Sequence, residues 1–352
     1  MTSRNRQYWE EYSNLQHTKH RIIREYLNGW FPKLGLWAGK ILYVDTHAGK
    51  GKHLTGEEGS PLVALRTFLA HNARDKILHK SDLNLIFIEY DQENAAELER
   101  ELQTFTDLPP QIHWKVYNRD AFDFLKELEI GLAPSFMFVD PFGFKISCEV
   151  LRRVMEHPRS ELLITLMWRE LDMLIRSEAK TEKQIRTLNE VFGCEEWKEI
   201  ADIETSDLRA ESAINLLQKR IGAKWSTYIK MLDNGRTRYL LLHLTNHNDG
   251  RDLIKNVLWN CCPEGGWFAR KTDDPKQYFL FNPEPDLCPL KRWVVDKLSE
   301  KSYKWSELED LIRSERWLKK HLWQIIKDLR KEGKITPIGK FTQTANPVIS
   351  LT

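Results

Sequence analysis

The chain has 352 residues, of which 41% are hydrophobic and 30% are charged, and its formal net charge is +2. This length allows two or three domains with ample buried core, and the composition excludes a largely disordered chain. No apolar run approaches the roughly 20 residues that a membrane-spanning helix needs, and the N-terminus lacks the apolar stretch of a secretory signal. We therefore expect a cytoplasmic protein without membrane contact.

The five cysteines, at positions 148, 194, 261, 262 and 288, form no CxxC pair and have no histidines at zinc-finger spacing. The sequence therefore predicts neither a disulfide framework nor a bound metal.

The first part of the chain alternates helical stretches with short apolar, β-branched runs. After an N-terminal helical segment (residues 1–40), the predicted strands are residues 41–45, 85–89, 112–117, 135–139 and 162–167. Such alternation favours an α/β domain, here residues 41–282, with a parallel sheet covered by helices on both faces.

The pattern changes after the fifth strand. Residues 168–224 are helical in pattern and predict an insertion, a candidate lid or substrate-binding element. Residues 225–232 and 238–244 are β-prone and are joined by Asp233-Asn234-Gly235, a strong hairpin signal. The expected sheet therefore has five parallel strands and a terminal antiparallel hairpin.

Residues 282–286 read as a linker because two prolines lie among turn-forming residues. Helical periodicity follows over 288–299, 306–313 and 316–331, and then two short β-prone stretches, which together outline a winged helix over residues 286–352. This region carries 14 Lys and Arg against 9 Asp and Glu, so the basic surplus of the chain lies here.

The third of these helices has an apolar face and an opposite basic stripe. The stripe consists of Arg316, Lys320, Trp323, Lys327 and Lys331. Cations supply sequence-independent affinity for phosphates and an exposed indole can stack on a base, so the stripe is a candidate RNA or DNA contact. A solvated helix face, or a domain that only contacts protein, explains the same pattern equally well.

Ligands of open α/β sheets settle beyond the carboxyl ends of the strands, so the loops there carry the candidate site. The first loop offers Asp45, His47, Gly49 and Gly51, where the glycines allow close backbone approach and Asp45 can bind an amino group. A phosphate-binding P-loop is excluded, because Thr46 stands where its first glycine belongs and His53 where its Mg²⁺-binding hydroxyl belongs.

Carboxylates follow the second and third strands. Glu89, with Asp91 as the second choice, can hold the two hydroxyls of a ribose, and Asp120 can accept from an adenine amino group. The alternative for Asp120 is that it caps the next helix.

The fourth strand ends in Asp140-Pro141-Phe142-Gly143. The aspartate and the proline carbonyl supply acceptors for a planar exocyclic amine, and the phenyl ring supplies a face on which its ring can stack.

Together these loops resemble those of class I S-adenosylmethionine-dependent methyltransferases over about residues 40–250. Residues 140–143 resemble the D/N-P-P-Y/F motif of amino-methylating enzymes, and more closely the D-P-F-G of tRNA N2-guanine dimethyltransferases. The resemblance implies a Rossmann-like sheet, S-adenosylmethionine as cofactor and an exocyclic amine as target.

A narrower resemblance spans most of the chain. The chain is similar to the bacterial three-Cys-motif partner proteins (TcmP), and it departs from them at His47, Lys50 and Lys52 of the first loop. The matching segments are Lys19-His20-x-Ile22-x-x-x-Tyr26, Tyr43-Val44-Asp45, Gly59-Ser60-Pro61-Leu62, Asp140-Pro141-Phe142-Gly143, Phe192-Gly193 with Trp197, and Thr245-Asn246-His247 with Lys255 and Trp259. This resemblance implies a partner, an iron–sulfur or radical-SAM-like protein that carries the three-Cys motif.

We therefore expect a methyltransferase acting on a base amine in RNA or DNA. Two alternatives stay open: a non-catalytic scaffold or binding subunit for the three-Cys partner, and a related transfer to a small molecule or peptide.

Overall fold

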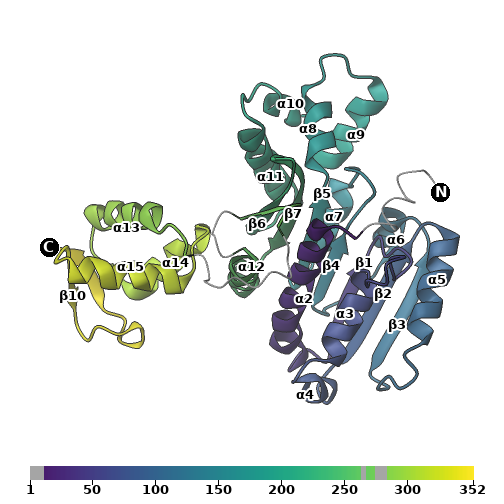
Figure 1. Cartoon of the computed structure of the whole chain (residues 1–352), viewed down its shortest axis with the longest axis horizontal. Coiled ribbons are helices and arrows are strands. Elements are labelled where there is room, and N and C mark those ends of the chain that lie inside the picture. The colour runs from purple at the N-terminus through teal and green to yellow at the C-terminus, as the bar shows by residue number, and fades with distance from the viewer. Residues whose placement is uncertain (1–11, 263–266, 274–283) are drawn as a thin grey trace. The chain divides into compact units, whose positions relative to one another are not determined.

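The computed structural model describes residues 12–262, 267–273 and 284–352. Their contacts separate two compact units, one made of residues 12–253 with 267–273 and the other of 254–262 with 284–352 (Figure 1). The boundary falls within helix α12 (Asn248–Cys261), so the second half of this helix belongs to the C-terminal unit.

The first unit is built on one eight-stranded sheet in the order β3-β2-β1-β4-β5-β7-β6-β8. The first five strands along the chain are parallel, β7 is antiparallel to both β5 and β6, and β8 is parallel to β6. The strands are β1 (Lys40–Asp45), β2 (Asp82–Glu89), β3 (Ile112–Asn118), β4 (Ser135–Val139), β5 (Ser160–Leu166), β6 (Trp225–Asp233), β7 (Arg236–Thr245) and β8 (Phe268–Arg270).

The expectation of an α/β domain with a large, mostly parallel sheet is confirmed. All seven predicted strands are present, each beginning and ending within three residues of the predicted bounds. They were recognisable because strands such as β4 and β5 are buried along their whole length and are dominated by apolar residues, with runs at 136–139 and 162–164. The three-residue β8 was not predicted, since it is too short to show a period.

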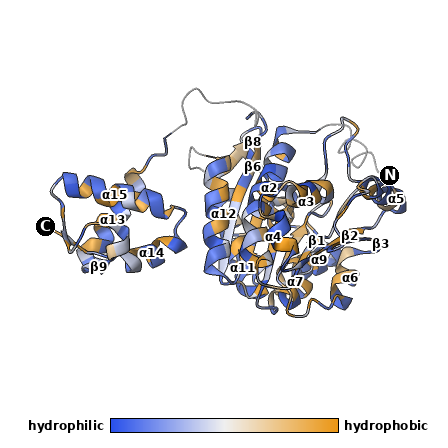
Figure 2. Cartoon of the chain, turned by 90° about the horizontal axis from the view of Figure 1, so that it is seen from below, coloured by the Kyte–Doolittle hydropathy of each residue, from blue (hydrophilic) through white to orange (hydrophobic). Residues whose placement is uncertain are grey.

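Helices cover both faces of this sheet. On one face, the rings of Tyr26 and Trp30 in α2 (Asn14–Gly35) contact Phe136 of β4, and Phe31 contacts Phe68 of α3 (Ser60–Leu69). The other flanking helices are α4 (Arg74–Leu78), α5 (Gln92–Gln103), α6 (Ala121–Glu127) and α7 (Cys148–Met155). Apolar residues are concentrated along the strands and the helix sides that pack on them (Figure 2).

Residues 168–224 are helical, as predicted. The four helices are α8 (Trp168–Arg176), α9 (Glu182–Phe192), α10 (Trp197–Ile200) and α11 (Ser206–Ile221), and their apolar sides join the core on the face opposite α2. A buried ion pair connects the first and last of them, because the Nε of Arg209 in α11 lies 2.6 Å from Asp172 of α8.

The C-terminal unit contains three helices and a three-stranded sheet in the order β10-β11-β9. Its elements are α13 (Cys288–Glu300), β9 (Tyr303–Lys304), α14 (Trp305–Ser314), α15 (Lys319–Lys331), β10 (Ile335–Ile338) and β11 (Val348–Leu351). Trp259 of α12 packs into the same core as Leu290, Trp305 and Ile326. The predicted linker, residues 282–286, lies partly outside the described residues.

No helix in the described part of the chain is both long enough and apolar enough to cross a membrane.

Candidate functional site

The predicted site loops meet at one edge of the large sheet. β1 lies between β2 and β4, and Asp45 at its end is in register with Phe87 and Phe138. Glu89 at the end of β2 is likewise in register with Asn118 of β3. Because the carboxyl ends of parallel strands meet at the same edge, this arrangement brings together the loops that carry Asp45, Glu89 and Asp140.

Glu89 holds the first loop against the second strand. One oxygen of its carboxylate accepts the backbone N–H of Gly49 and the other that of Asp91, each at 2.8 Å. The positive φ of Gly49 (63°) and Gly51 (90°) allows this tight backbone path. Burial, at 6% exposure, raises the pKa of Glu89. The Asn94 side chain also hydrogen-bonds this carboxylate, and the carboxylate's remaining acceptor capacity could serve a ligand hydroxyl.

Asp91, the second choice for that role, caps a helix instead. Its carboxylate accepts the N–H of Asn94 at 3.0 Å, in the first turn of α5.

Asp45 is completely buried beneath the first loop. Its carboxyl accepts the N–H of His47 at 3.3 Å and also hydrogen-bonds the Ser60 side chain. Burial, together with the nearby charge of Asp140, outweighs these hydrogen bonds and raises the pKa of Asp45 to about 7. The carboxyl therefore titrates near neutrality, and a cationic ligand group would favour its ionised form.

His47, in the same loop, has a neutral imidazole near pH 7. Burial lowers its pKa to about 4, although Asp140 and Asp120 both favour the charged form. Its Nδ1 lies 2.8 Å from the Thr46 hydroxyl and its ring centroid lies 6.2 Å from that of Phe122. The ring contact joins the first and third loops, and the charge of Asp140 in the fourth loop also acts on this imidazole.

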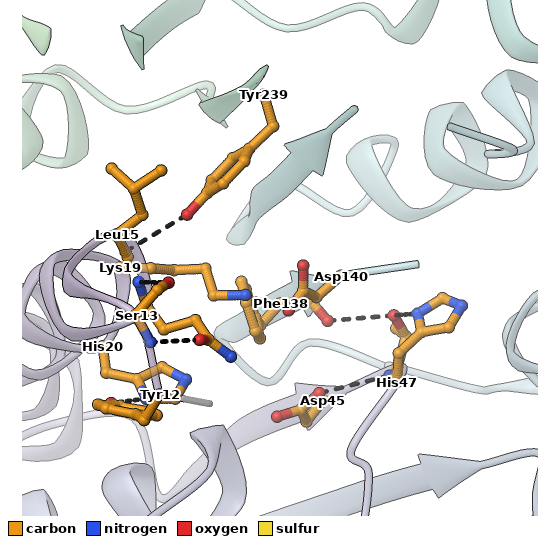
Figure 3. A network of polar contacts seen from close by, with 12 residues as sticks. Tyr12, Ser13, Leu15, Lys19, His20, Asp45, His47, Phe138, Asp140 and Tyr239 are labelled. Atoms are coloured by element: carbon orange, nitrogen blue, oxygen red, sulfur yellow. Dashed lines mark hydrogen bonds and ion pairs between the residues drawn. The ribbon is translucent and has the colours of Figure 1, made fainter. Parts of the chain in front are cut away.

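Asp140 is paired with a lysine to which the sequence assigned no role in the site. The Nζ of Lys19 in α2 lies 2.5 Å from Oδ2 of Asp140, and Lys19 is only 3% exposed (Figure 3). The ammonium also lies 5.8 Å from the centroid of Phe138. The pair engages Oδ2 and leaves Oδ1 as the oxygen to which another amine could donate.

The rest of the fourth loop differs in exposure. Pro141 is buried, whereas Phe142 is 59% exposed and Gly143 has a positive φ of 112°. An exposed phenyl ring beside a carboxylate can present one face to a planar ligand.

Asp120 caps helix α6, which was the alternative considered for it. Its Oδ1 accepts the N–H groups of Phe122 and Asp123 at 2.9 and 3.0 Å. The residue is exposed, and its proposed contact with adenine stays a prediction.

The basic stripe of the C-terminal unit is only partly displayed. Arg316, Lys320, Lys327 and Lys331 are exposed. Trp323 is half-buried: its ring stacks on Phe341 with centroids 4.8 Å apart and meets Trp305 edge-on at 4.8 Å. This packing limits the area of the indole that a base could contact. Arg316 precedes α15, and its guanidinium lies over Trp317.

None of the five cysteines forms a disulfide, and no cluster of three or more His, Cys, Asp or Glu side chains suited to a metal occurs within the described ranges.

Among known proteins, only solved structures show similarity to this chain. No family model matches the chain, and neither does any curated protein. Trm1 from Pyrococcus horikoshii, solved with S-adenosyl-L-methionine, matches with 12% identity and a TM-score of 0.40 over 68% of this chain and 58% of its own length. This chain therefore spans little more than half the length of that protein.

Two further structures illustrate the range of these matches. Cyclopropane synthase MmaA2 from Mycobacterium tuberculosis has 14% identity and a TM-score of 0.31, covering 71% of this chain and 70% of its own. The putative methyltransferase yhhF from Escherichia coli has 21% identity and a TM-score of 0.26, covering 41% and 66%. TM-scores below 0.5 carry no argument, so the case for function rests on the strand order and loops of this chain.

Proposed function

We propose that this protein is an S-adenosylmethionine-dependent methyltransferase that modifies an exocyclic amine of a base in RNA or DNA. The observation that carries the proposal is the convergence of Asp45, Glu89 and Asp140 at the carboxyl edge of a sheet ordered 3-2-1-4-5-7-6. Five parallel strands closed by an antiparallel hairpin are the arrangement expected of a class I methyltransferase.

The donors and acceptors of this edge fit the proposed cofactor. Glu89 would hold the ribose hydroxyls through the remaining acceptor capacity of its buried carboxylate, and Asp45 would hold the ammonium of the methionine part. Gly49 and Gly51 would let the backbone approach it, and Asp120 would accept from the adenine amine. When bound, the cofactor supplies an electrophilic methyl group on a sulfonium.

The chain's own residues would orient the acceptor amine. The amine would donate to Oδ1 of Asp140 and to the Pro141 carbonyl, while its ring stacks on Phe142. As the amine gains a carbon it must lose a proton, and Oδ1 of Asp140 or solvent would take it. Positioning of the acceptor nitrogen against the methyl group would account for most of the rate acceleration, since proximity and orientation can lower an activation barrier by several kcal/mol.

Two features of the C-terminal unit support the proposal that the substrate is a nucleic acid. We assign it as a winged helix, because three helices and a three-stranded sheet follow one another in the order α13, β9, α14, α15, β10, β11. The exposed cations Arg316, Lys320, Lys327 and Lys331 would contact phosphates. The resemblance to TcmP proteins adds a three-Cys-motif protein as the proposed partner.

One observation favours a second candidate, a binding subunit that holds the partner without transferring a methyl group. The Lys19 ammonium already pairs with Oδ2 of Asp140, so only the second oxygen of the carboxylate that would hold the substrate amine is left for a ligand. A scaffold would keep this ion pair permanently, whereas an enzyme would have to bind its substrate beside it.

Transfer of labelled methyl from S-adenosylmethionine to total cellular RNA, DNA or protein distinguishes the two. We expect label in a nucleic-acid fraction, abolished in Asp140→Ala and retained in the matched control Asp107→Asn, which changes an aspartate at an exposed turn. Absence of label with the partner present would favour the scaffold. Equal label in wild type and Asp140→Ala would remove the proposed amine site.

A further inference from the structure

A cavity lies at the edge of the large sheet opposite the one that carries Asp140. Its volume is about 530 Å³, within the usual range for small-molecule sites, and it lies where β5 begins and β7 ends. β5 has seven residues, so this edge is about 20 Å from the carboxyl edge that carries Asp140. The cavity therefore belongs to neither the proposed cofactor site nor the proposed amine site.

The cavity wall includes an aromatic platform that is already held in place. Trp37 is 54% exposed, and its indole N–H donates to the Lys33 carbonyl at 2.6 Å. The Arg159 guanidinium lies 4.8 Å from the Trp37 ring centroid. The two contacts orient the ring without a ligand, so a planar group stacking on it would immobilise little further.

Cations surround this platform. Lys33, Arg159 and Lys224 all line the cavity, together with the first residues of α12, whose N-terminus adds partial positive charge. Within the described residues Arg159 has no carboxylate partner, and the ammonium of Lys224 donates to the neutral Asn248 at 3.0 Å.

The two acids of the wall are already engaged. Glu161 is buried and is hydrogen-bonded to the hydroxyl of Tyr26 and to Nε2 of His243. Asp249 is paired with Lys33 at 3.0 Å. The charge that remains available to a ligand at the cavity is therefore positive.

The wall also contains a buried donor without an acceptor. Trp30 is 2% exposed, and its Nε1 has no hydrogen-bond partner among the described residues. An unsatisfied buried N–H costs about 1–3 kcal/mol, and a ligand oxygen entering the cavity could relieve that cost.

We propose that this cavity binds a nucleotide, with the base stacked on Trp37 and the phosphate held by Arg159 and Lys224. A planar ring joined to an anion is the chemistry that matches an oriented indole surrounded by unneutralised cations. The nucleotide is either free or part of a nucleic-acid chain, and these two sources share the same contacts.

Calorimetry of the full chain tests the proposal with the four 5′-ribomononucleotides, their nucleosides, inorganic phosphate and a ten-residue oligoribonucleotide. Saturating S-adenosylhomocysteine is present throughout, so that the adenosine part of a probe cannot bind at the proposed cofactor site and add to the measured heat. We expect at least one mononucleotide, or the oligonucleotide, to bind more tightly than the nucleoside and phosphate. Tighter binding of the oligonucleotide would identify a nucleic-acid chain as the source.

Two variants and a control locate the binding. Trp37→Ala should weaken it about five- to a hundredfold, the range of one base–aromatic stack, and Arg159→Met should weaken it about tenfold. Arg153→Met, at an exposed position of α7, should leave it unchanged. The proposal is overturned if no probe binds at millimolar concentration, if both variants bind as wild type does, or if nucleoside or phosphate alone binds as well as the nucleotide.

Discussion

Replacing Asp45 by asparagine should stabilise the protein, and the gain should grow with pH. Burial raises the pKa of this carboxyl from 3.8 to about 7. Between these two pKa values the folded protein keeps a proton on Asp45 that the unfolded chain releases. The contribution of Asp45 to the free energy of unfolding is therefore fully present below pH 4 and is lost as the pH rises through 7. At about 1.4 kcal/mol per pKa unit, ionising Asp45 in the folded state costs up to about 4 kcal/mol.

Asparagine has the same shape and cannot ionise, so it removes this cost. Between pH 5 and pH 8 the advantage of Asp45→Asn over wild type should grow by about 3 kcal/mol, which corresponds to roughly 6–12 °C in Tm for a unit of this size. Thermal unfolding at both pH values measures it, with Asp107→Asn as the matched control. A Tm difference that is the same at pH 5 and pH 8, or a variant less stable than wild type at pH 8, would refute this account of Asp45.

Three further predictions follow from buried or exposed groups of the first unit. Lys19→Met should destabilise the protein by about 3 kcal/mol by leaving the half-buried Asp140 unpaired, and adding Asp140→Asn should restore much of the loss in denaturant unfolding. Arg209→Met should lower the free energy of unfolding by about 3–5 kcal/mol, because Asp172 loses its bidentate partner. Protease cleavage within residues 168–224 should then increase, and unchanged cleavage would contradict this. Phe142→Ala should lower kcat/KM about tenfold for the methyl acceptor without changing S-adenosylhomocysteine affinity, and a change in that affinity instead would place the ring at the cofactor.

The elements of the first unit could be predicted because their signals are local. β4 and β5 are buried along their whole length, and each contains an apolar run, residues 136–139 and 162–164. Asp45, Glu89 and Asp140 could be selected because each stands at the carboxyl end of a predicted strand, and parallel strands end at a common edge.

The contacts of the site could not be predicted in the same way. Lys19 and Asp140 are 121 residues apart, and their pairing depends on how α2 packs against the sheet. The available signal was a lysine on the apolar face of that helix, next to the buried Ile22 and Ile23. Trp323 shows the reverse case, because helical spacing placed it on a basic stripe while Phe341, from a loop beyond β10, packs on its ring.

Calorimetric titration of the wild-type protein with S-adenosylhomocysteine tests the central claim most directly, with Glu89→Ala as the pocket variant. The arrangement of Asp45, Gly49 and Glu89 predicts one binding site per chain. The affinity should be at least tenfold lower in Glu89→Ala. In the wild type it should fall as the pH drops below 7, because Asp45 then takes up its proton. No binding to wild type at any pH between 6 and 8 would contradict the claim that this edge of the sheet holds the cofactor.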